Sequence, residues 1–554
     1  MRENLAVTKV LDSSGSRAGQ PARSDFSNAV GVAESAPEWL IDNAEAYDRM
    51  LQAIASARRS VCMTQLAFDA DCVAYTGDVS ADSPAAGKTV LAESLVAAVV
   101  RAPVDVRILL NATLLLDTTR PLRRFFAERL RALSPIPGTV RVRGISRFPQ
   151  LLHAKMVIVD GKEAFLLGSP FANGYWDDSR HVPVDPRRPA RELGGRPLHD
   201  VSLRVTGWPV ADLQRVFTEM WSLTAPRPVP DAAPDSIGAD ADELTMCPRR
   251  AGGPGEPAPP SVRIVCTAPA RLLPRARRGA TQILDALLEG IAGARTLIYV
   301  EHQYLSARPV VSALAEALWR EPDLELIAVL NQNPDVTAYQ QWQNARLAES
   351  GLLEHPRAGV FALWSLARDA RRGGAATLNQ VFVHSKVVVV DDLWATGGSA
   401  NLDGVSLHSY GDDFTGRAAR RIFRDVRNFD VNVVVRDGAA GAAGRSGSRT
   451  VADLRARLWS EHLGVPLASL TERPPDGWLP RWRARAAANV EALGGPGAAG
   501  EMRGFVLPYS VQRTPALQLT DLGLQIDPAR LDLRFNPGWL EVQLSPNWVR
   551  NMFI

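Results

Sequence analysis

The chain has 554 residues, of which 46% are hydrophobic and 22% are charged, so its composition is that of a globular protein and excludes an intrinsically disordered one. Its net charge of +3 gives no support for a broad nucleic-acid-binding surface or for a polybasic membrane anchor. The four cysteines show no zinc-binding spacing.

The sequence shows no sign of a secretory or membrane-spanning segment. The first residues lack the apolar core of a secretory signal, and no run of eighteen apolar residues occurs. We therefore expect a cytoplasmic or peripheral membrane protein, with export by a route that needs no such signal still open.

Composition shifts along the chain predict two lobes with irregular sequence around them. The first stretch is rich in Ser, Ala, Gly and Arg, and a central stretch has the Pro, Gly and Asp content of a linker. The predicted parts are a mobile leader (1–37), a first lobe (38–225), a linker (226–260), a second lobe (261–470) and a C-terminal extension of unknown role (471–554).

Both lobes follow the same order of predicted elements. Residues 46–69 and 280–305 each show a helical period followed by a strand, and they share QAIASAR and EGIAGAR at matching places. The closing helices both begin with VADL, at residues 210 and 451. The copies are offset by 237 residues at the first helix, 231 at the motif described next and 241 at the closing helix, which indicates a duplication.

A short motif occurs once in each copy, as LHAKMVIVDG (152–161) and HSKVVVVDD (384–392). In a strand, residues two apart project to the same side, so each histidine and its lysine should face one site together. The apolar runs that follow are typical of strands buried on both faces. The members are His153, Lys155 and Asp160 in the first copy and His384, Lys386 and Asp391 in the second.

These residue types suit phosphate chemistry. Histidine can act as a nucleophile or carry a proton near neutral pH, and lysine supplies a positive charge for a phosphate. A duplicated pair could place two imidazoles and two ammonium groups around one anion. By contrast, Asp160 and Asp391 each end a predicted strand and are expected to fix a turn rather than take part in the chemistry.

Further polar residues follow each motif at matched places. Asp200 comes 47 residues after His153 and Asp430 comes 46 residues after His384, so a carboxylate in each copy could accept a hydrogen bond from the imidazole and fix its tautomer. In each copy a Gly-Ser pair and an asparagine lie between the histidine and this aspartate. The serines suit either a phosphate contact or the shaping of a loop. The phosphate-binding candidates are Ser169, Asn173, Ser399 and Asn401.

The paired motif resembles that of the phospholipase D superfamily, whose signature is His-x-Lys, four residues and Asp, followed by Gly-Ser and Asn. The resemblance implies an α/β fold in which two duplicated α/β/α sandwich lobes pack as a pseudo-dimer around one active site. It implies metal-independent cleavage through a phosphohistidine, without a cofactor. His153 would be the nucleophile and His384 the general acid and base. Lys155, Lys386 and Asn401 would hold the phosphate oxygens, and Asp200 and Asp430 would orient the histidines.

The resemblance implies an enzyme that cleaves or transfers the phosphatidyl group of a phospholipid. The alternatives are a cardiolipin or phosphatidylserine synthase-type transferase, a nuclease of the same superfamily and, less favoured, a non-catalytic lipid-binding module. We expect a monomer that meets its phospholipid at a membrane surface, with no obligate metal and no nucleic-acid partner.

The remaining polar residues give weaker indications of a function. Glu301 suits either a buried supporting position or a simple hydrogen-bond anchor. The other histidines have no partner with the same role in the opposite copy and are interpreted as ordinary residues: His181, His199, His302, His355, His408 and His462.

Overall fold

The computed structural model describes residues 31–32, 37–76, 87–113, 116–147, 150–188, 195–224, 261–273, 276–332, 334, 337–369, 375–409, 425–437, 449–494, 501–511 and 531–534. The predicted linker, 226–260, and nearly all of the predicted leader lie outside these residues. Within them, no helix is long and apolar enough to cross a membrane.

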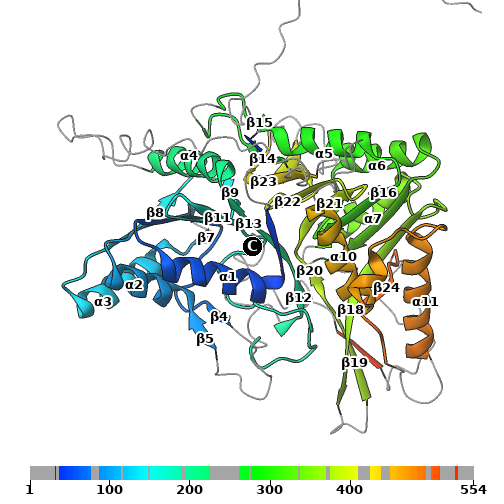
Figure 1. The fold of residues 1–554 in the computed structure, drawn as a ribbon, viewed down its shortest axis with the longest axis horizontal. Helices are drawn as coiled ribbons and strands as arrows, with labels where there is room; N and C mark the ends of the chain where they lie inside the picture. The colour runs from blue at the N-terminus through cyan, green and yellow to red at the C-terminus, as the bar shows by residue number, and fades with distance from the viewer. Residues whose placement is uncertain are drawn as a thin grey trace, which may run out of the picture.

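The first lobe is built on a mixed sheet with helices on its faces, coloured from blue through cyan to blue-green in Figure 1. Its strands follow the order β2 (Glu38–Ile41), β13 (Val201–Thr206), β11 (Glu163–Leu166), β10 (Met156–Val159), β3 (Ser60–Gln65), β6 (Asp105–Thr113), with β7 (Leu116–Asp117) and β8 (Thr139–Ile145) beside β6. Its helices are α1 (Asp42–Ser56), α2 (Leu91–Arg101), α3 (Thr119–Leu133) and α4 (Trp208–Ser222), and a small ladder joins β4 (Val73–Tyr75) to β5 (Lys88–Val90).

The second lobe repeats this arrangement. Its strands follow the order β14 (Ser261–Ala268), β23 (Asn428–Arg436), β22 (Trp394–Gly398), β21 (Lys386–Val390), β16 (Leu297–His302), β17 (Glu325–Leu330), β18 (Ala358–Asp369), β19 (Ala375–Gln380). From β14 to β18 the pairs are antiparallel up to β16 and parallel after it, which matches the series from β2 to β8 pair by pair. Its helices are α5 (Gln282–Gly293), α6 (Arg308–Arg320), α7 (Thr337–Glu349), α8 (Gly404–Leu407) and α10 (Thr450–Leu463).

This correspondence confirms the predicted α/β fold with two duplicated lobes. The helix–strand blocks aligned in the sequence are α1–β3 and α5–β16, and the VADL segments belong to α4 and α10. The two copies therefore kept their fold while most of their residues diverged.

The central strands are hydrophobic throughout because both of their faces are buried. In β10, Met156 and Ile158 pack into a core shared by both lobes, whereas Val157 and Val159 pack against the outer helices of the first lobe. The valines of β21, 387–390, alternate in the same way between the shared core and the outer helices of the second lobe. A period of two in the two sheets therefore accounts for the three large cores of the described residues.

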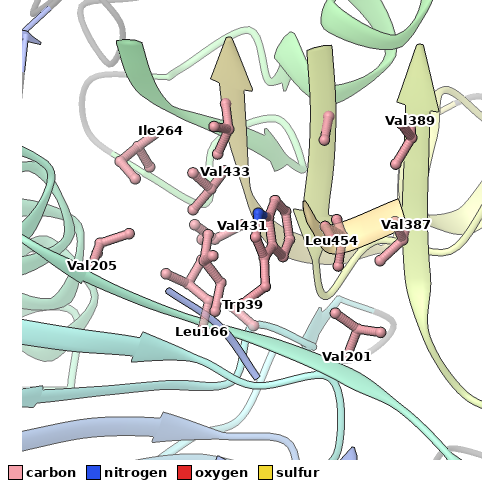
Figure 2. Packing of buried hydrophobic residues seen from close by; sticks show 14 of the residues in the cluster. Trp39, Leu166, Val201, Val205, Ile264, Val387, Val389, Val431, Val433 and Leu454 are labelled. Atoms are coloured by element: carbon pink, nitrogen blue, oxygen red, sulfur yellow. The ribbon is translucent and has the colours of Figure 1, made fainter. Parts of the chain in front are cut away.

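The shared core contains residues of both lobes packed together. Figure 2 shows Trp39 of β2, in the first lobe, close to Val431 and Leu454 of the second lobe. A Cβ atom on Gly397 of β22 would lie 2.7 Å from the Trp39 ring, so a larger residue there would push the lobes apart.

Two short parallel ladders also tie one lobe to the other. Strand β9 (Leu151–Leu152) of the first lobe pairs with β23 of the second, and β12 (Leu198–His199) of the first pairs with β20 (Phe382–Val383) of the second. Strand β9 is followed directly by His153 and β23 contains Asp430, whereas β12 is followed directly by Asp200 and β20 by His384. These ladders therefore set the geometry of the site.

Segments outside the predicted lobes add to the second lobe. β1 (Gly31–Val32), within the predicted leader, pairs with β14. In the C-terminal extension, β24 (Val506–Pro508) pairs with β18 and β25 (Leu531–Arg534) pairs with β19, while α11 (Leu479–Gly494) packs on the same sheet. The described parts of this extension therefore complete the second lobe.

Candidate active site

The two His-x-Lys segments lie at the junction of the lobes. His153 and Lys155 precede β10 in an extended connection from β9, and His384 lies between β20 and β21, whose first residue is Lys386. The prediction that each histidine sits within its strand is therefore wrong: the strand begins later, because the short ladder to the other lobe comes first. All four side chains are buried, with at most 5% of the residue surface exposed.

Each histidine pairs with the aspartate of the other lobe. His153 Nδ1 lies 2.6 Å from Asp430 Oδ1, and His384 Nδ1 lies 2.9 Å from Asp200 Oδ2. The β9–β23 ladder ends beside the first pair, and the β12–β20 ladder ends beside the second. A carboxylate at Nδ1 holds the proton on that nitrogen and leaves the Nε2 lone pair for chemistry.

The Gly-Ser turns support the aspartates. Ser399 donates to Asp430 Oδ1 at 2.7 Å, and Ser169 donates to Asp200 Oδ2. The serines therefore contact the carboxylates that orient the histidines, rather than standing free for a phosphate. Gly168 precedes Ser169, and a Cβ atom there would overlap the Asp200 carboxylate, which explains the need for glycine.

The lysines bring two positive charges into the same buried space. Lys155 donates to the backbone carbonyl of His153 at 2.9 Å, and Lys386 donates to Gln303 Oε1 at 3.1 Å and to the carbonyl of His384. Burial, with the repulsion of Lys386, lowers the pKa of Lys155 to about 7. The two ammonium groups are thus close enough to repel each other, and an anion between them would relieve that repulsion.

Burial also lowers the pKa values of the two histidines. Burial and then Lys155 lower the pKa of His153 to about 4, and burial and then Lys386 lower the pKa of His384 to about 3, despite the paired aspartates. Both imidazoles are therefore neutral at neutral pH in the free protein. His384 Nε2 is buried, and within the part of the chain that the structure describes it has no hydrogen-bond partner.

The two candidate asparagines differ. Asn401 is buried, with 6% of its surface exposed, and its Oδ1 atom has no hydrogen-bond partner among the described residues. Asn173 instead donates its side-chain amide to Asp71 at 2.9 Å, and its backbone amide to Asp69. The expectation that Asn173 faces a phosphate is not met, because the longer spacing after Gly-Ser carries it into a neighbouring turn.

The motif aspartates hold the sheet together. Asp160 accepts hydrogen bonds from the backbone amides of residues 58–60, and Asp391 accepts them from those of residues 295–297. Each carboxylate thus satisfies the amides that lead from a helix into the next strand of its lobe, far from any reacting group.

A second buried polar cluster, which we call the interlobe cluster, lies behind His384. Glu301 accepts from His462 Nε2 at 2.8 Å and from Ser385 at 2.5 Å, and its Oε1 lies 2.9 Å from His199 Nε2. The backbone carbonyl of His199 also accepts a hydrogen bond from the backbone amide of His384, at 2.8 Å. The cluster consists of Asp42, Asp177, His181, His199, Glu301, Glu461 and His462.

Sequence reasoning treated three histidines of this cluster, His181, His199 and His462, as ordinary residues. The one available signal was position: His199 directly precedes Asp200, and the dipeptide Glu-His occurs at both 301–302 and 461–462. Nothing in a single sequence says that these distant segments meet. Two overlapping groups of the cluster could hold a metal ion, and among the described residues neither group includes His153 or His384.

Known proteins show sequence similarity to the part of the chain that carries the second motif. A family model described as "Cardiolipin synthase, PLD-like domain" matches residues 287–416, which include the second motif. Phospholipase D zeta 1 of Arabidopsis thaliana is 33% identical over 115 residues, or 21% of this chain and 9% of that protein. Cardiolipin synthase A of Pseudomonas fluorescens (strain SBW25) is 27% identical over 259 residues, or 46% of this chain and 41% of that protein.

The chain thus spans between 9% and 41% of the length of these curated relatives. Among solved structures, a phosphatidylserine synthase of Haemophilus influenzae Rd KW20 aligns with a TM-score of 0.44 and 13% identity, over 73% of this chain and 83% of that one. The sequence matches confirm the resemblance that the paired motif indicated.

Proposed function

We propose that this chain, a member of the phospholipase D superfamily, cleaves or transfers the phosphatidyl group of a phospholipid through a covalent phosphohistidine. The observation that supports this proposal most is the reciprocal pairing of His153 with Asp430 and of His384 with Asp200, beside two buried lysines. Two oriented imidazoles and two ammonium groups are what a two-step displacement at a phosphodiester requires.

In the first step, His153 Nε2 attacks phosphorus and forms a P–N bond while the P–O bond to the head-group alcohol breaks. His384 Nε2 donates a proton to the departing oxygen, so the alcohol leaves neutral. His384 is neutral in the free protein, and the bound phosphodiester, as an anion beside it, favours its protonation. Asp430 and Asp200 stabilise the positive charge on the two rings.

In the second step, neutral His384 takes a proton from water or from an acceptor alcohol. The oxygen attacks phosphorus, the P–N bond breaks, and His153 is regenerated. Water gives phosphatidic acid, and an alcohol gives a new phosphodiester. Hydrolysis and transfer therefore share one intermediate and differ only in the acceptor that reaches it.

Charge in the transition state falls on the non-bridging oxygens, and Lys155, Lys386 and Asn401 are the groups proposed to hold them. Because these groups supply the positive charge, the displacement itself needs no metal ion and no cofactor. The substrate would be a phospholipid presented at a membrane surface to a monomeric protein.

A second candidate function is that of a cardiolipin synthase-type transferase, which would use a lipid alcohol as acceptor. The matching family model carries that description, and several relatives of 25–27% identity carry that name. No comparable observation favours a nuclease.

Product analysis tests the proposal and separates the candidates. Purified protein would be incubated separately with phosphatidylcholine, with phosphatidylglycerol and with plasmid DNA, each with and without a primary alcohol. We expect phosphatidic acid from phosphatidylcholine, diverted to a phosphatidyl ester by the alcohol. Cardiolipin from phosphatidylglycerol alone would favour the transferase, and cleavage of DNA without any lipid product would contradict the proposal. The variant His153→Asn, which lacks the proposed nucleophile, should form no product in these incubations. Its matched control is His355→Asn, at a partly exposed site, which should form the same products as wild type.

A further inference from the structure

Four donor atoms of the interlobe cluster lie close together between the lobes. Asp42 Oδ1 lies 2.9 Å from His199 Nδ1 and 3.8 Å from His181 Nε2. Glu461 Oε1 lies 3.1 Å from His199 Nδ1 and 3.2 Å from His181 Nε2. All four atoms lie within 4.8 Å of one another. They come from three separate segments of the first lobe and from α10 of the second.

These distances fit the coordination shell of a metal. Ligand atoms at ~2.0–2.1 Å from a tetrahedral Zn²⁺ ion are about 3.3–3.4 Å apart, and the measured spacings of 2.9, 3.1, 3.2 and 3.8 Å lie on both sides of that value. We propose that Asp42, His181, His199 and Glu461 bind a divalent transition-metal ion, with Zn²⁺ favoured by the nitrogen and oxygen donors and by the number of ligands, four.

The surroundings of the two histidines support this assignment. Metal-binding histidines usually direct their second ring nitrogen at a carboxylate, which fixes the tautomer and strengthens the ligand. His181 directs Nδ1 at Asp177 Oδ2, at 3.0 Å, and His199 directs Nε2 at Glu301 Oε1, at 2.9 Å. Both histidines therefore have an acid on the side away from the proposed ion.

Charge and unmade hydrogen bonds point the same way. Among the described residues, neither lysine nor arginine forms an ion pair with Asp42, Glu301 or Glu461, although Asp42 and Glu301 are fully buried. Buried carboxylates need a compensating charge. Asp42 Oδ2 and His199 Nδ1, on the side of the proposed ion, also lack partners in hydrogen-bond geometry, despite the short distances around them. One dication would balance two of the carboxylates.

A site closed by four protein ligands has no position for substrate, so its role is structural. The ion would connect the first lobe to α10. One of its ligands, His199, directly precedes Asp200 in the sequence. Its role would be to hold the lobes in the register that the reciprocal pairs need. This inference goes beyond the proposed function and stands whatever reaction the protein catalyses.

Metal analysis of the whole chain tests the proposal. Protein purified without chelators is expected to carry about one zinc ion per chain, measured by plasma mass spectrometry. Asp42→Asn and Glu461→Gln, which keep the size of the side chain, should lower the metal content at least tenfold. His355→Asn should not. Added Zn²⁺ should raise the thermal midpoint of metal-depleted wild type and leave that of the two variants unchanged.

Two further measurements keep the test decisive if a variant folds poorly. Co²⁺ added to metal-depleted wild type should give the strong visible bands of four-coordinate cobalt. His462→Gln should keep its metal, because His462 belongs only to the overlapping group with Glu301. The proposal is overturned if wild type holds no metal and neither Zn²⁺ nor Co²⁺ has an effect, since protonated histidines would then balance the carboxylates. Loss of metal in His462→Gln but not in Glu461→Gln would likewise refute this ligand set.

Discussion

His153 of the first lobe donates its Nδ1 hydrogen to Asp430 of the second lobe across 2.6 Å, and the mirror pair, His384 with Asp200, runs the other way at 2.9 Å. Neither lobe holds both members of either of these two pairs. The duplicated fold therefore yields one site rather than two, and each histidine depends on the packing between lobes for its orientation.

The reciprocal pairs predict that the two aspartates affect different steps. Asp430→Asn should slow formation of the covalent adduct, because His153 loses the acceptor that fixes its tautomer, and Asp200→Asn should slow its breakdown through His384. Each should lower turnover by ~10²–10⁴-fold, as for a misoriented catalytic histidine. A p-nitrophenyl phosphodiester, whose leaving group needs no proton, separates the steps: we expect a burst of nitrophenol with Asp200→Asn and none with Asp430→Asn. Identical kinetics in both variants would show that the pairs do not divide the work in this way.

The lysines predict a loss of charge stabilisation without a loss of folding. Lys155→Met and Lys386→Met should each lower kcat/KM by roughly 10²–10³-fold, the cost of one buried donor to a charged transition state. Removing a buried ammonium should leave the thermal midpoint unchanged or higher. Lys162→Met, at an exposed turn of the same lobe, is the control and should retain full activity.

The lowered histidine pKa values predict acid sensitivity. An unfolded histidine titrates near 6.5, but burial and the lysines hold the pKa of His153 at about 4 and that of His384 at about 3. Between 6.5 and these values the unfolded chain binds more protons than the folded one, so the free energy of unfolding falls as pH is lowered through this window. The free energy of unfolding, measured by urea denaturation between about pH 4.5 and 6.5, should change less steeply with pH in His153→Asn and His384→Asn than in wild type. The same dependence on pH in the variants and in wild type would mean that these histidines are not held neutral.

Gly168 predicts a steric effect on catalysis. In Gly168→Ala the new methyl group would overlap the Asp200 carboxylate, so Asp200 must move away from His384. We expect turnover to fall at least tenfold and stability to fall by ~1–3 kcal/mol, as for other overpacked sites. Gly293→Ala is the control, because a Cβ atom there meets nothing within 4 Å. Unchanged turnover in Gly168→Ala would show that this contact is not needed.

Local patterns predicted much of this fold, and long-range contacts account for what they missed. Apolar runs such as VVVV of β21 and the shared VADL starts were sufficient for the lobes and their duplication, because both reflect local periodicity. The pairing of His153 with Asp430 depends on the β9–β23 ladder, whose two-residue strands carry no pattern of their own. The interlobe cluster joins segments as far apart as Asp42 and Glu461, a contact that a single sequence does not encode visibly.

Trapping the intermediate tests the central claim most directly. His384→Asn removes the proton carrier that breakdown of the adduct requires, while a p-nitrophenyl phosphodiester still allows the first step. A brief reaction, quenched and digested, should show by mass spectrometry an acid-labile phosphoryl adduct on the peptide that contains His153, and His153→Asn should show none. An adduct on the His384 peptide, or no adduct in any variant that still releases nitrophenol, would contradict the account.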